Sequence, residues 1–185
     1  MTEILDKNAV QTVLNEADLL CSQEEVEQGL DRMAIEITQV LQEEFPICLS
    51  VMLGGLIFSG QLVTRLHFPL ELDYIHATRY RDTTQGHDLD WQRRPRLCLE
   101  GRSVLVMDDI LDEGVTLQSI NDYCYQAGAS KVYSAVLVDK DRERKGLSKA
   151  DFVGVTVPDR YVFGYGMDYK SHLRHVAGIY AVKGL

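Results

Sequence analysis

The sequence predicts an α/β protein in which helices flank both faces of a central parallel sheet. Apolar runs of strand length alternate with segments of helical periodicity along most of the chain, an order typical of parallel strands that helices connect. The 185 residues include 45% hydrophobic and 25% charged residues, which is an ordinary globular composition. The length suits a single domain over residues 1–185 with a sizeable core.

Residues 1–45 are expected to form an N-terminal helical segment, with a helix over about residues 23–44. Ser22 and Glu25 have the spacing of a capping box, in which each side chain accepts a hydrogen bond from the other residue's backbone N–H. Pro46 follows the helix and ends it. Apolar residues recur at helical spacing between these signals, at Val26, Leu30, Met33, Ile37, Val40 and Leu41.

The middle of the chain predicts two strands around a helix, followed by a long loop. Residues 81–96 are polar and carry Gly86, Pro95 and many charges, so we expect a mobile loop there. Long loops in compact domains often act as lids. The elements expected before the loop are a strand over residues 47–53, a tight turn at Gly54 and Gly55, a helix over 56–66 and a strand over 70–80.

The second half of the chain continues the alternation of strand and helix. A helix is expected over residues 116–127, where Gly128 ends it. Residues 140–149 are highly charged and predict a surface connection. Strands are expected at 97–99 or directly at 103–109, at 131–138, and near 151–156, 160–163 and 176–182.

Charge and cysteine usage exclude several classes of function. The formal net charge is −9, so no overall positive field is present to attract nucleic acid or anionic membranes. No apolar run reaches membrane-spanning length, and the first residues lack the features of a signal peptide. Cys21, Cys48, Cys98 and Cys124 form no Cys-x-x-Cys pair, and the histidines also lack metal-ligand spacing. We therefore expect a cytoplasmic protein with reduced thiols.

Residues 104–117 carry the most informative motif. An apolar run over 104–107 delivers Asp108 and Asp109 at the carboxyl end of a strand. Consecutive strand side chains point to opposite faces, so the two carboxylates can bind different ligands. A turn then returns Asp112 to the same place.

The turn after these carboxylates has the features of a phosphate-binding loop. Gly114 permits backbone conformations that other residues avoid. The helix that begins near Thr116 offers N–H groups and the positive end of its dipole to an anion. Carboxylates for sugar hydroxyls or Mg²⁺ and amides for phosphate thus occur in one short segment, which we interpret as a ribose-phosphate site.

This motif resembles the phosphoribosyl diphosphate (PRPP) signature of the type I phosphoribosyltransferases. The shared pattern is an apolar strand, two acidic residues, two apolar ones, Asp, a variable residue, Gly, a variable residue and Thr. The resemblance extends to the 6-oxopurine branch through Lys140 and residues 159–169, and it covers about residues 45–180. It implies that family's fold, with a small hood beside the sheet. It also implies purine salvage, in which PRPP and hypoxanthine or guanine give IMP or GMP and pyrophosphate.

The resemblance implies a role for each residue of the motif. Asp108 and Asp109 would contact the ribose hydroxyls and Mg²⁺, and Asp112 would be the acid or base at the purine N7. Glu113 stands where many relatives carry Ser or Thr. A carboxylate repels phosphate, so we expect its side chain to turn to solvent while its N–H donates. The loop around the 5′-phosphate would consist of Asp112, Glu113, Gly114, Val115 and Thr116.

A pyrophosphate-binding loop is also implied by the resemblance, at Leu53, Gly54 and Gly55, with a cis peptide bond between Met52 and Leu53. Leu53 replaces a polar or basic residue common in relatives, so the loop backbone would have to bind the pyrophosphate. Arg174 matches the pyrophosphate arginine of the family.

The purine site implied by the resemblance uses residues late in the chain. Lys140 would donate to the 6-oxo group, Tyr161 would stack on the base, and backbone groups around Val162 would read its edge. Asp168, beside the base, would bind Mg²⁺. Adenine offers Lys140 no acceptor at C6, so 6-oxopurines should be preferred, while the choice among hypoxanthine, guanine and xanthine stays open.

Other charged residues have weaker assignments. Clustered arginines beside the expected loop favour polyphosphate contact in an acidic protein. The residues that flank this loop are Arg79, Tyr80, Arg81, Arg93, Arg94 and Arg96. Arg142, Arg144 and Lys145 are interpreted as surface charges, and Trp91 has no assigned role.

Three alternatives stay open at this point. Residues 108–112 spell Asp-Asp-x-x-Asp, a pattern that binds Mg²⁺-pyrophosphate in all-helical prenyl-transferring enzymes. A regulator that keeps the fold to sense PRPP or a nucleotide is the non-catalytic alternative. A xanthine-preferring phosphoribosyltransferase is the third. By resemblance, the partners are PRPP, a 6-oxopurine and Mg²⁺, and the chain would form a homodimer or homotetramer.

Overall fold

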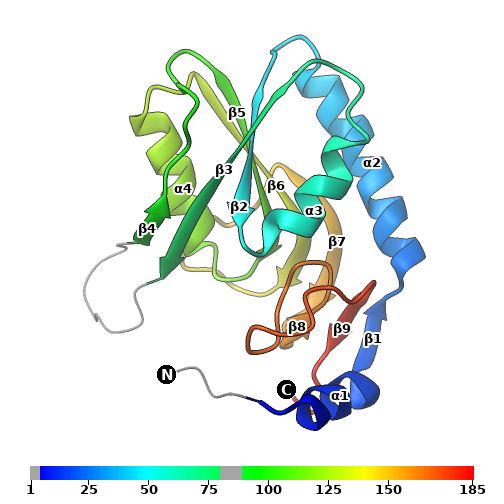
Figure 1. The fold of residues 1–185 in the computed structure, drawn as a ribbon. Coiled ribbons are helices and arrows are strands. Elements are labelled where there is room, and N and C mark those ends of the chain that lie inside the picture. The colour runs from blue at the N-terminus through cyan, green and yellow to red at the C-terminus, as the bar shows by residue number, and fades with distance from the viewer. Residues whose placement is uncertain (1–4, 80–88) are drawn as a thin grey trace.

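Six strands form the central sheet of the computed structural model, which describes residues 5–79 and 89–185 (Figure 1). Their order is β4-β3-β2-β5-β6-β7, and neighbours are parallel except for β3 and β4. The strands are β2 (Ile47–Met52), β3 (Glu71–Arg79), β4 (Leu89–Arg93), β5 (Ser103–Leu111), β6 (Lys131–Asp141) and β7 (Phe152–Pro158). The α/β class with a central parallel sheet is therefore confirmed.

Helices cover both faces of this sheet, as the sequence predicts. Side chains alternate along β5, so Leu105 and Met107 pack with α2 and α3, whereas Val104 and Val106 pack with α4. All four side chains are fully buried, and burial of each contributes roughly 1.5–3 kcal/mol. The helices are α1 (Lys7–Glu16), α2 (Gln23–Leu41), α3 (Gly55–Val63) and α4 (Val115–Gln126).

A smaller antiparallel sheet forms the hood that the resemblance implies. It consists of β1 (Asp18–Cys21), β9 (Ile179–Ala181) and β8 (Val162–Phe163), in that order. Figure 1 shows this sheet below the carboxyl ends of the central strands, with α1 beside it. The hood has its own apolar core of Phe163, Leu173 and Val182, against which Val10, Val13 and Leu14 of α1 pack.

The first 45 residues are not entirely helical, which corrects the prediction of an N-terminal helical segment. The capping box at Ser22 and Glu25 is present and starts α2, which ends at Leu41. The preceding residues form β1 because they pair with β9 at the far end of the chain. A pairing so distant in sequence leaves no local signal, and tertiary context overrides helix propensity there.

The expected loop over residues 81–96 is also partly wrong, because β4 occupies residues 89–93 and pairs with β3. Residues 80–88 lie outside the described part of the chain. Trp91 of β4 packs against Tyr123 of α4, with ring centroids 4.9 Å apart, and this contact gives the tryptophan a role in the core. Residues 97–99 are not a strand, so the next strand is β5.

The strands that carry the predicted site are longer than expected. β5 includes Asp108, Asp109 and the residues up to Leu111, and β6 extends through Lys140 to Asp141. The prenyl-transfer alternative is wrong, because its aspartate motif must lie on a helix. No helix within residues 5–79 and 89–185 is long and apolar enough to cross a membrane.

Candidate active site

A cleft of about 330 Å³ lies where the carboxyl ends of the central strands meet the hood. Open α/β sheets bind ligands at this end because loops and helix N-termini converge there. The predicted PRPP residues that line the cleft are Leu53, Gly54, Asp108, Asp109, Asp112, Gly114, Thr116 and Arg174. Predicted residues from three separate segments of the chain, 53–54, 108–116 and 174, thus line one cleft.

Asp108 and Asp109 form the acidic floor of the cleft. Each residue is only 8% exposed, and the backbone N–H of Asp109 donates to Asp108 Oδ1 at 2.9 Å. Burial raises the pKa of the Asp108 carboxyl well above its usual range, and the neighbouring Asp109 raises it further. Burial also raises the pKa of Asp109. A cation or a set of sugar hydroxyls placed here would compensate these poorly solvated carboxylates.

The phosphate loop takes its shape from Gly114. This residue has φ +74° and caps α4, and a Cβ added to it would lie 2.3 Å from the carbonyl oxygen of Leu147. Two backbone hydrogen bonds hold the loop against the connection that follows β6. Gly146 N donates to Glu113 O at 3.0 Å, and Leu147 N donates to Gly114 O at 3.1 Å. The start of α4 is thereby fixed at the cleft, where its dipole favours an anion.

Three of the predicted PRPP residues, Gly55, Glu113 and Val115, are not among the described residues that line the cleft. Glu113 Oε1 lies 3.5 Å from Lys145 Nζ, and its side chain is 29% exposed. This ion pair with an exposed lysine draws the carboxylate toward the surface of the loop. The expectation that the Glu113 side chain turns from the phosphate site agrees with this geometry, although it pairs with Lys145 rather than with solvent alone.

The predicted pyrophosphate loop lies between β5 and the hood. The peptide bond between Met52 and Leu53 is cis, as the resemblance implies. A Cβ on Gly54 would lie 2.0 Å from Asp109 Oδ2, and a Cβ on Gly166 would lie 2.0 Å from the Gly54 carbonyl oxygen. A side chain at Gly54 would displace the Asp109 carboxylate, and one at Gly166 would clash with backbone, so the loop backbone is held directly beside the acidic floor.

A second cavity of about 260 Å³ adjoins the cleft and shares Asp109, Ile110 and Asp112 with it. Its other lining residues are Lys140, Tyr161, Val162, Met167 and Asp168. All four residues predicted to bind the purine therefore line one cavity. We refer to this cavity as the purine pocket.

The donor and the aromatic side of the purine pocket come from different elements. Lys140, near the end of β6, is 8% exposed, and its ammonium lies 3.4 Å from Asp112 Oδ2. Tyr161 is 42% exposed, and its ring meets Tyr169 edge to face, with centroids 5.7 Å apart. An exposed ring at a pocket wall leaves a face for a planar base.

Asp168 and Arg174 form an ion pair between the two cavities. Their closest atoms are 2.7 Å apart, and Asp168 also accepts a hydrogen bond from Ser171 N at 2.6 Å. Arg174 donates in addition to the carbonyl of Gly166. The guanidinium is thus fixed at the pyrophosphate end of the cleft, and Asp168 faces the purine pocket.

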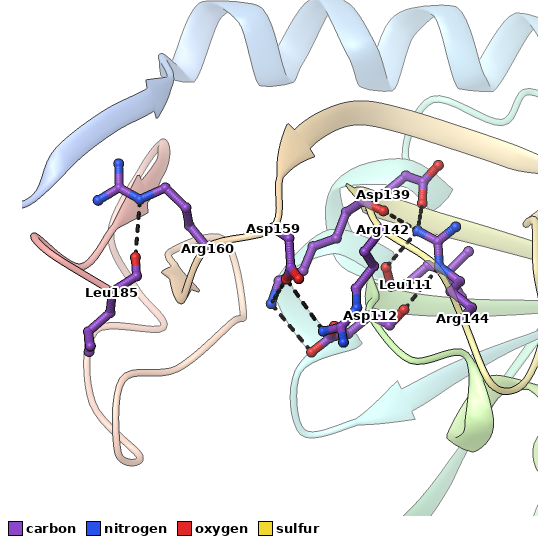
Figure 2. A network of polar contacts seen from close by, with 9 residues as sticks. Leu111, Asp112, Asp139, Arg142, Arg144, Asp159, Arg160 and Leu185 are labelled. Carbon is purple, nitrogen blue, oxygen red and sulfur yellow. Dashed lines mark hydrogen bonds and ion pairs between the residues drawn. The ribbon is translucent and has the colours of Figure 1, made fainter.

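The interpretation of Arg142 and Arg144 as surface charges is wrong. Arg144 has a side chain only 9% exposed and donates to the carbonyl of Ser148 at 2.9 Å. It also donates to the carbonyl of Asp112 at 3.0 Å and to Asp139 (Figure 2). Arg142 Nη1 lies 2.7 Å from Asp112 Oδ1. Charge runs are usually solvated, so sequence alone gave no sign that this one folds back onto the site.

Replacing Arg144 with Ala should destabilise the fold. The side chain satisfies buried carbonyls around the phosphate loop and pairs with Asp139, so its loss should lower the free energy of unfolding by about 3 kcal/mol. Urea denaturation measures this value. Lys149→Ala removes an exposed charge from the same connection and should stay within about 0.5 kcal/mol of the wild type. An equally small effect of both substitutions would contradict the structural role of Arg144.

Sequence reasoning missed His76 and Ala77, which line the cleft from the end of β3. Their position could have placed them in the cleft. β3 is the parallel neighbour of β2, so its last residues lie beside the pyrophosphate loop that follows β2. Among the predicted polyphosphate contacts, Arg93 instead stacks over Tyr74 at 3.9 Å. Arg94 lies over the rings of Trp91 and Tyr123. The Arg79 side chain, Tyr80 and Arg81 lie outside the described residues.

The carboxylates of the site fit a magnesium ion that arrives with its substrate. No three His, Cys, Asp or Glu side chains among residues 5–79 and 89–185 form a ready metal site. Mg²⁺, however, usually binds one or two carboxylates together with substrate phosphates and water. Asp108, Asp109 and Asp168 supply hard oxygen ligands beside the predicted pyrophosphate position.

Comparison with known proteins reveals extensive similarity. Residues 18–172 match the family model described as the phosphoribosyl transferase domain. The chain is 33% identical to the hypoxanthine-guanine phosphoribosyltransferase of Bacillus subtilis, over 89% of this chain and 92% of that protein. It is 29% identical to the hypoxanthine-guanine-xanthine phosphoribosyltransferase of Tritrichomonas foetus, over 89% and 91% respectively.

Solved structures show the same likeness in three dimensions. The crystal structure of a hypoxanthine phosphoribosyltransferase from Staphylococcus aureus superposes with a TM-score of 0.87 at 26% identity. The match covers 96% of this chain and 97% of that one. The similarity therefore includes both the central sheet and the hood.

Proposed function

Since the chain belongs to the phosphoribosyltransferase family, we propose that it transfers the 5-phosphoribosyl group of PRPP to hypoxanthine or guanine. The products are IMP or GMP and pyrophosphate, and the role is purine salvage. The observation that carries this proposal is the junction of the two cavities at Asp112. This residue begins the phosphate loop in the cleft and also lines the pocket that contains the buried Lys140.

The two cavities bind the reactants in line. The phosphate loop from Asp112 to Thr116 holds the 5′-phosphate, Asp108 and Asp109 hold the ribose hydroxyls, and the purine pocket holds the base. Fixing both reactants in one orientation removes an entropic cost of roughly 7 kcal/mol or more relative to a bimolecular encounter. The purine N9 then forms a bond to C1′ as the bond from C1′ to the pyrophosphate oxygen breaks.

Asp112 handles the proton in this reaction. Hypoxanthine that attacks through N9 carries its imidazole proton on N7, and the Asp112 carboxylate accepts that proton as the new bond forms. Lys140 donates to the 6-oxo group at the other edge of the base and fixes the orientation in which N7 meets Asp112. The close approach of these two side chains, 3.4 Å, supports a shared position along one edge of a purine.

The pyrophosphate leaves between Arg174 and the loop of Leu53 to Gly55. Arg174 supplies positive charge, and the loop amides supply donors, so that negative charge developing on the leaving group is stabilised. When Mg²⁺ is bound, Asp108, Asp109 and Asp168 would hold it, and it would neutralise part of the pyrophosphate charge. The Leu53 side chain adds no charge to this end of the cleft.

Turnover with separate bases tests the proposal. The protein should convert hypoxanthine and guanine with PRPP and Mg²⁺, and adenine should react far more slowly because it has no 6-oxo acceptor for Lys140. Xanthine belongs in the same panel, since a similar protein from Tritrichomonas foetus is a hypoxanthine-guanine-xanthine phosphoribosyltransferase. Turnover of xanthine above the other two bases would favour the xanthine-preferring alternative.

Lys140→Ala should reduce the selectivity for 6-oxopurines. Loss of a hydrogen bond from a buried charged donor costs about 1.5–3 kcal/mol, so kcat/KM for hypoxanthine should fall by about 10- to 150-fold. The KM for PRPP should stay close to that of the wild type, because Lys140 lines only the purine pocket among the two cavities of the site. A parallel loss of PRPP affinity would contradict this assignment.

We also propose that the chain forms homodimers or homotetramers, on the basis of the resemblance. Size-exclusion chromatography with light scattering gives the mass directly. A mass of 20.9 kDa at micromolar concentration would correspond to a monomer and would contradict this part of the proposal.

A further inference from the structure

Four charged side chains meet at the edge of the purine pocket, and the predicted roles account for only two of them. Lys140 lies near the end of β6 and contacts Asp112 and Asp159. Arg142, just after β6, contacts the same two carboxylates (Figure 2). Lys140 Nζ lies 3.4 Å from Asp112 and 3.6 Å from Asp159. Arg142 Nη1 lies 2.7 Å from Asp112 and 3.4 Å from Asp159. Each cation therefore contacts both carboxylates.

The two oxygens of Asp112 have different partners. Oδ1 accepts from Arg142 at 2.7 Å, and Oδ2 is 3.4 Å from Lys140. The guanidinium contact is the shorter one and has the geometry of a charge-assisted hydrogen bond. When a base is bound, Lys140 turns its donor to the 6-oxo group. Arg142 is then the cation that still holds Asp112.

Arg142 is placed so that a bound base does not displace it. It is not among the described residues lining either the cleft or the purine pocket, although Asp112 lines both. Its Nε is buried and has no hydrogen-bond partner among the residues that the structure describes. Partial burial limits the screening of its ion pairs by solvent, and Asp159 pairs with the same Nη1 atom that contacts Asp112.

We propose that Arg142 is the positioning residue for Asp112, and this inference rests on the proposed phosphoribosyl transfer. Arg142 binds Oδ1 and thereby turns Oδ2 toward the purine pocket, where it accepts the N7 proton. Asp159 keeps both Arg142 and Lys140 in place. Arg142 contacts the carboxylates of Asp112 and Asp159, so it orients the acid/base group. Arg144 contacts backbone carbonyls and Asp139 but not the Asp112 carboxylate, so it supports the loop.

Steady-state kinetics of Arg142→Ala test this role. A carboxylate that is free to rotate should lower kcat for hypoxanthine about tenfold, since small misplacements of a reacting group cost one to two orders of magnitude. The KM for PRPP and the melting temperature should be unchanged. Arg142→Lys retains the charge and should recover part of the lost kcat. Lys149→Ala, an exposed lysine on the same connection, is the matched control and should behave as the wild type.

A double-mutant cycle shows whether Arg142 acts through Asp112. In an Asp112→Asn background, Arg142→Ala should cause little further loss of kcat. An equal loss in both backgrounds, or a lower melting temperature with kcat unchanged, would overturn the inference alone. If Arg142→Ala does not fold, Arg142→Gln, which keeps the side chain as far as Cδ and a polar end but removes the charge, decides the same question. A wild-type protein without turnover would overturn the proposed function and this inference with it.

Discussion

Asp112→Asn lowers kcat for hypoxanthine by about 100-fold or more, because the amide cannot take the N7 proton as the base attacks C1′. The substitution keeps the size and shape of the side chain. It should therefore leave the KM for PRPP near the wild-type value, since the phosphate loop binds through its backbone. Initial rates of IMP formation at saturating PRPP measure the effect.

The structure provides a reason why this variant should remain folded. Arg144 holds the backbone carbonyl of Asp112 at 3.0 Å, and this bond does not depend on the carboxylate. The melting temperature should thus match that of the wild type and serves as the control. A kcat reduced less than about tenfold would mean that Asp112 contributes position rather than proton transfer.

Gly114→Ala removes most PRPP binding. The alanine Cβ would lie 2.3 Å from the Leu147 carbonyl oxygen, and the residue would have to keep φ at +74°, where L side chains are disfavoured. The left-handed conformation alone costs about 1–2 kcal/mol, and the contact with backbone cannot be relieved by a side-chain rotation. The loop must move, so the KM for PRPP should rise by at least about tenfold.

Gly60→Ala is the matched control for this change. Gly60 lies within α3, and nothing approaches within 4 Å of the position that its Cβ would take. Alanine is a better helix former than glycine, so this variant should gain up to about 1 kcal/mol of stability and retain its kinetics. Isothermal titration with PRPP and Mg²⁺ compares the two variants. Equal PRPP affinity for both would show that Gly114 does not shape the phosphate site.

Local signals predicted the central sheet and the part of the site that residues 104–117 form. The capping box at Ser22 and Glu25 starts α2, and the apolar run before Asp108 is a buried strand. The chemistry of the motif over residues 104–117 depends on a strand, a turn and a helix that are contiguous in sequence. Of the site residues predicted within this motif, Glu113 and Val115 do not line the cleft, whereas the others do, namely Asp108, Asp109, Asp112, Gly114 and Thr116.

The features that sequence missed depend on strand pairing, between distant parts of the chain for β1 and between consecutive strands for β4. β1 exists because Asp18 to Cys21 pair with β9, and β4 because residues 89–93 pair with β3. His76 belongs to the cleft only through the parallel pairing of β3 with β2. Such pairings reflect the packing of the whole sheet rather than local propensity.

The charged run after β6 shows the same limit at the level of side chains. Lys140 was assigned by resemblance to the purine pocket and lines it, yet Arg142 and Arg144 in the same run were interpreted as solvated. In the structure, the connection turns back over the phosphate loop, and Gly146 and Leu147 bond to Glu113 and Gly114. This turn brings the arginines to Asp112. Composition describes how charged a segment is, but not the direction in which it folds.

The identity of the products tests the proposed phosphoribosyl transfer most directly. The protein, incubated with hypoxanthine, PRPP and Mg²⁺, should form IMP and pyrophosphate in equal amounts, as mass spectrometry and a pyrophosphate assay would measure. We expect catalytic turnover of this kind. Bound PRPP without IMP formation, for hypoxanthine and for guanine alike, would contradict it and would favour a regulator that senses PRPP.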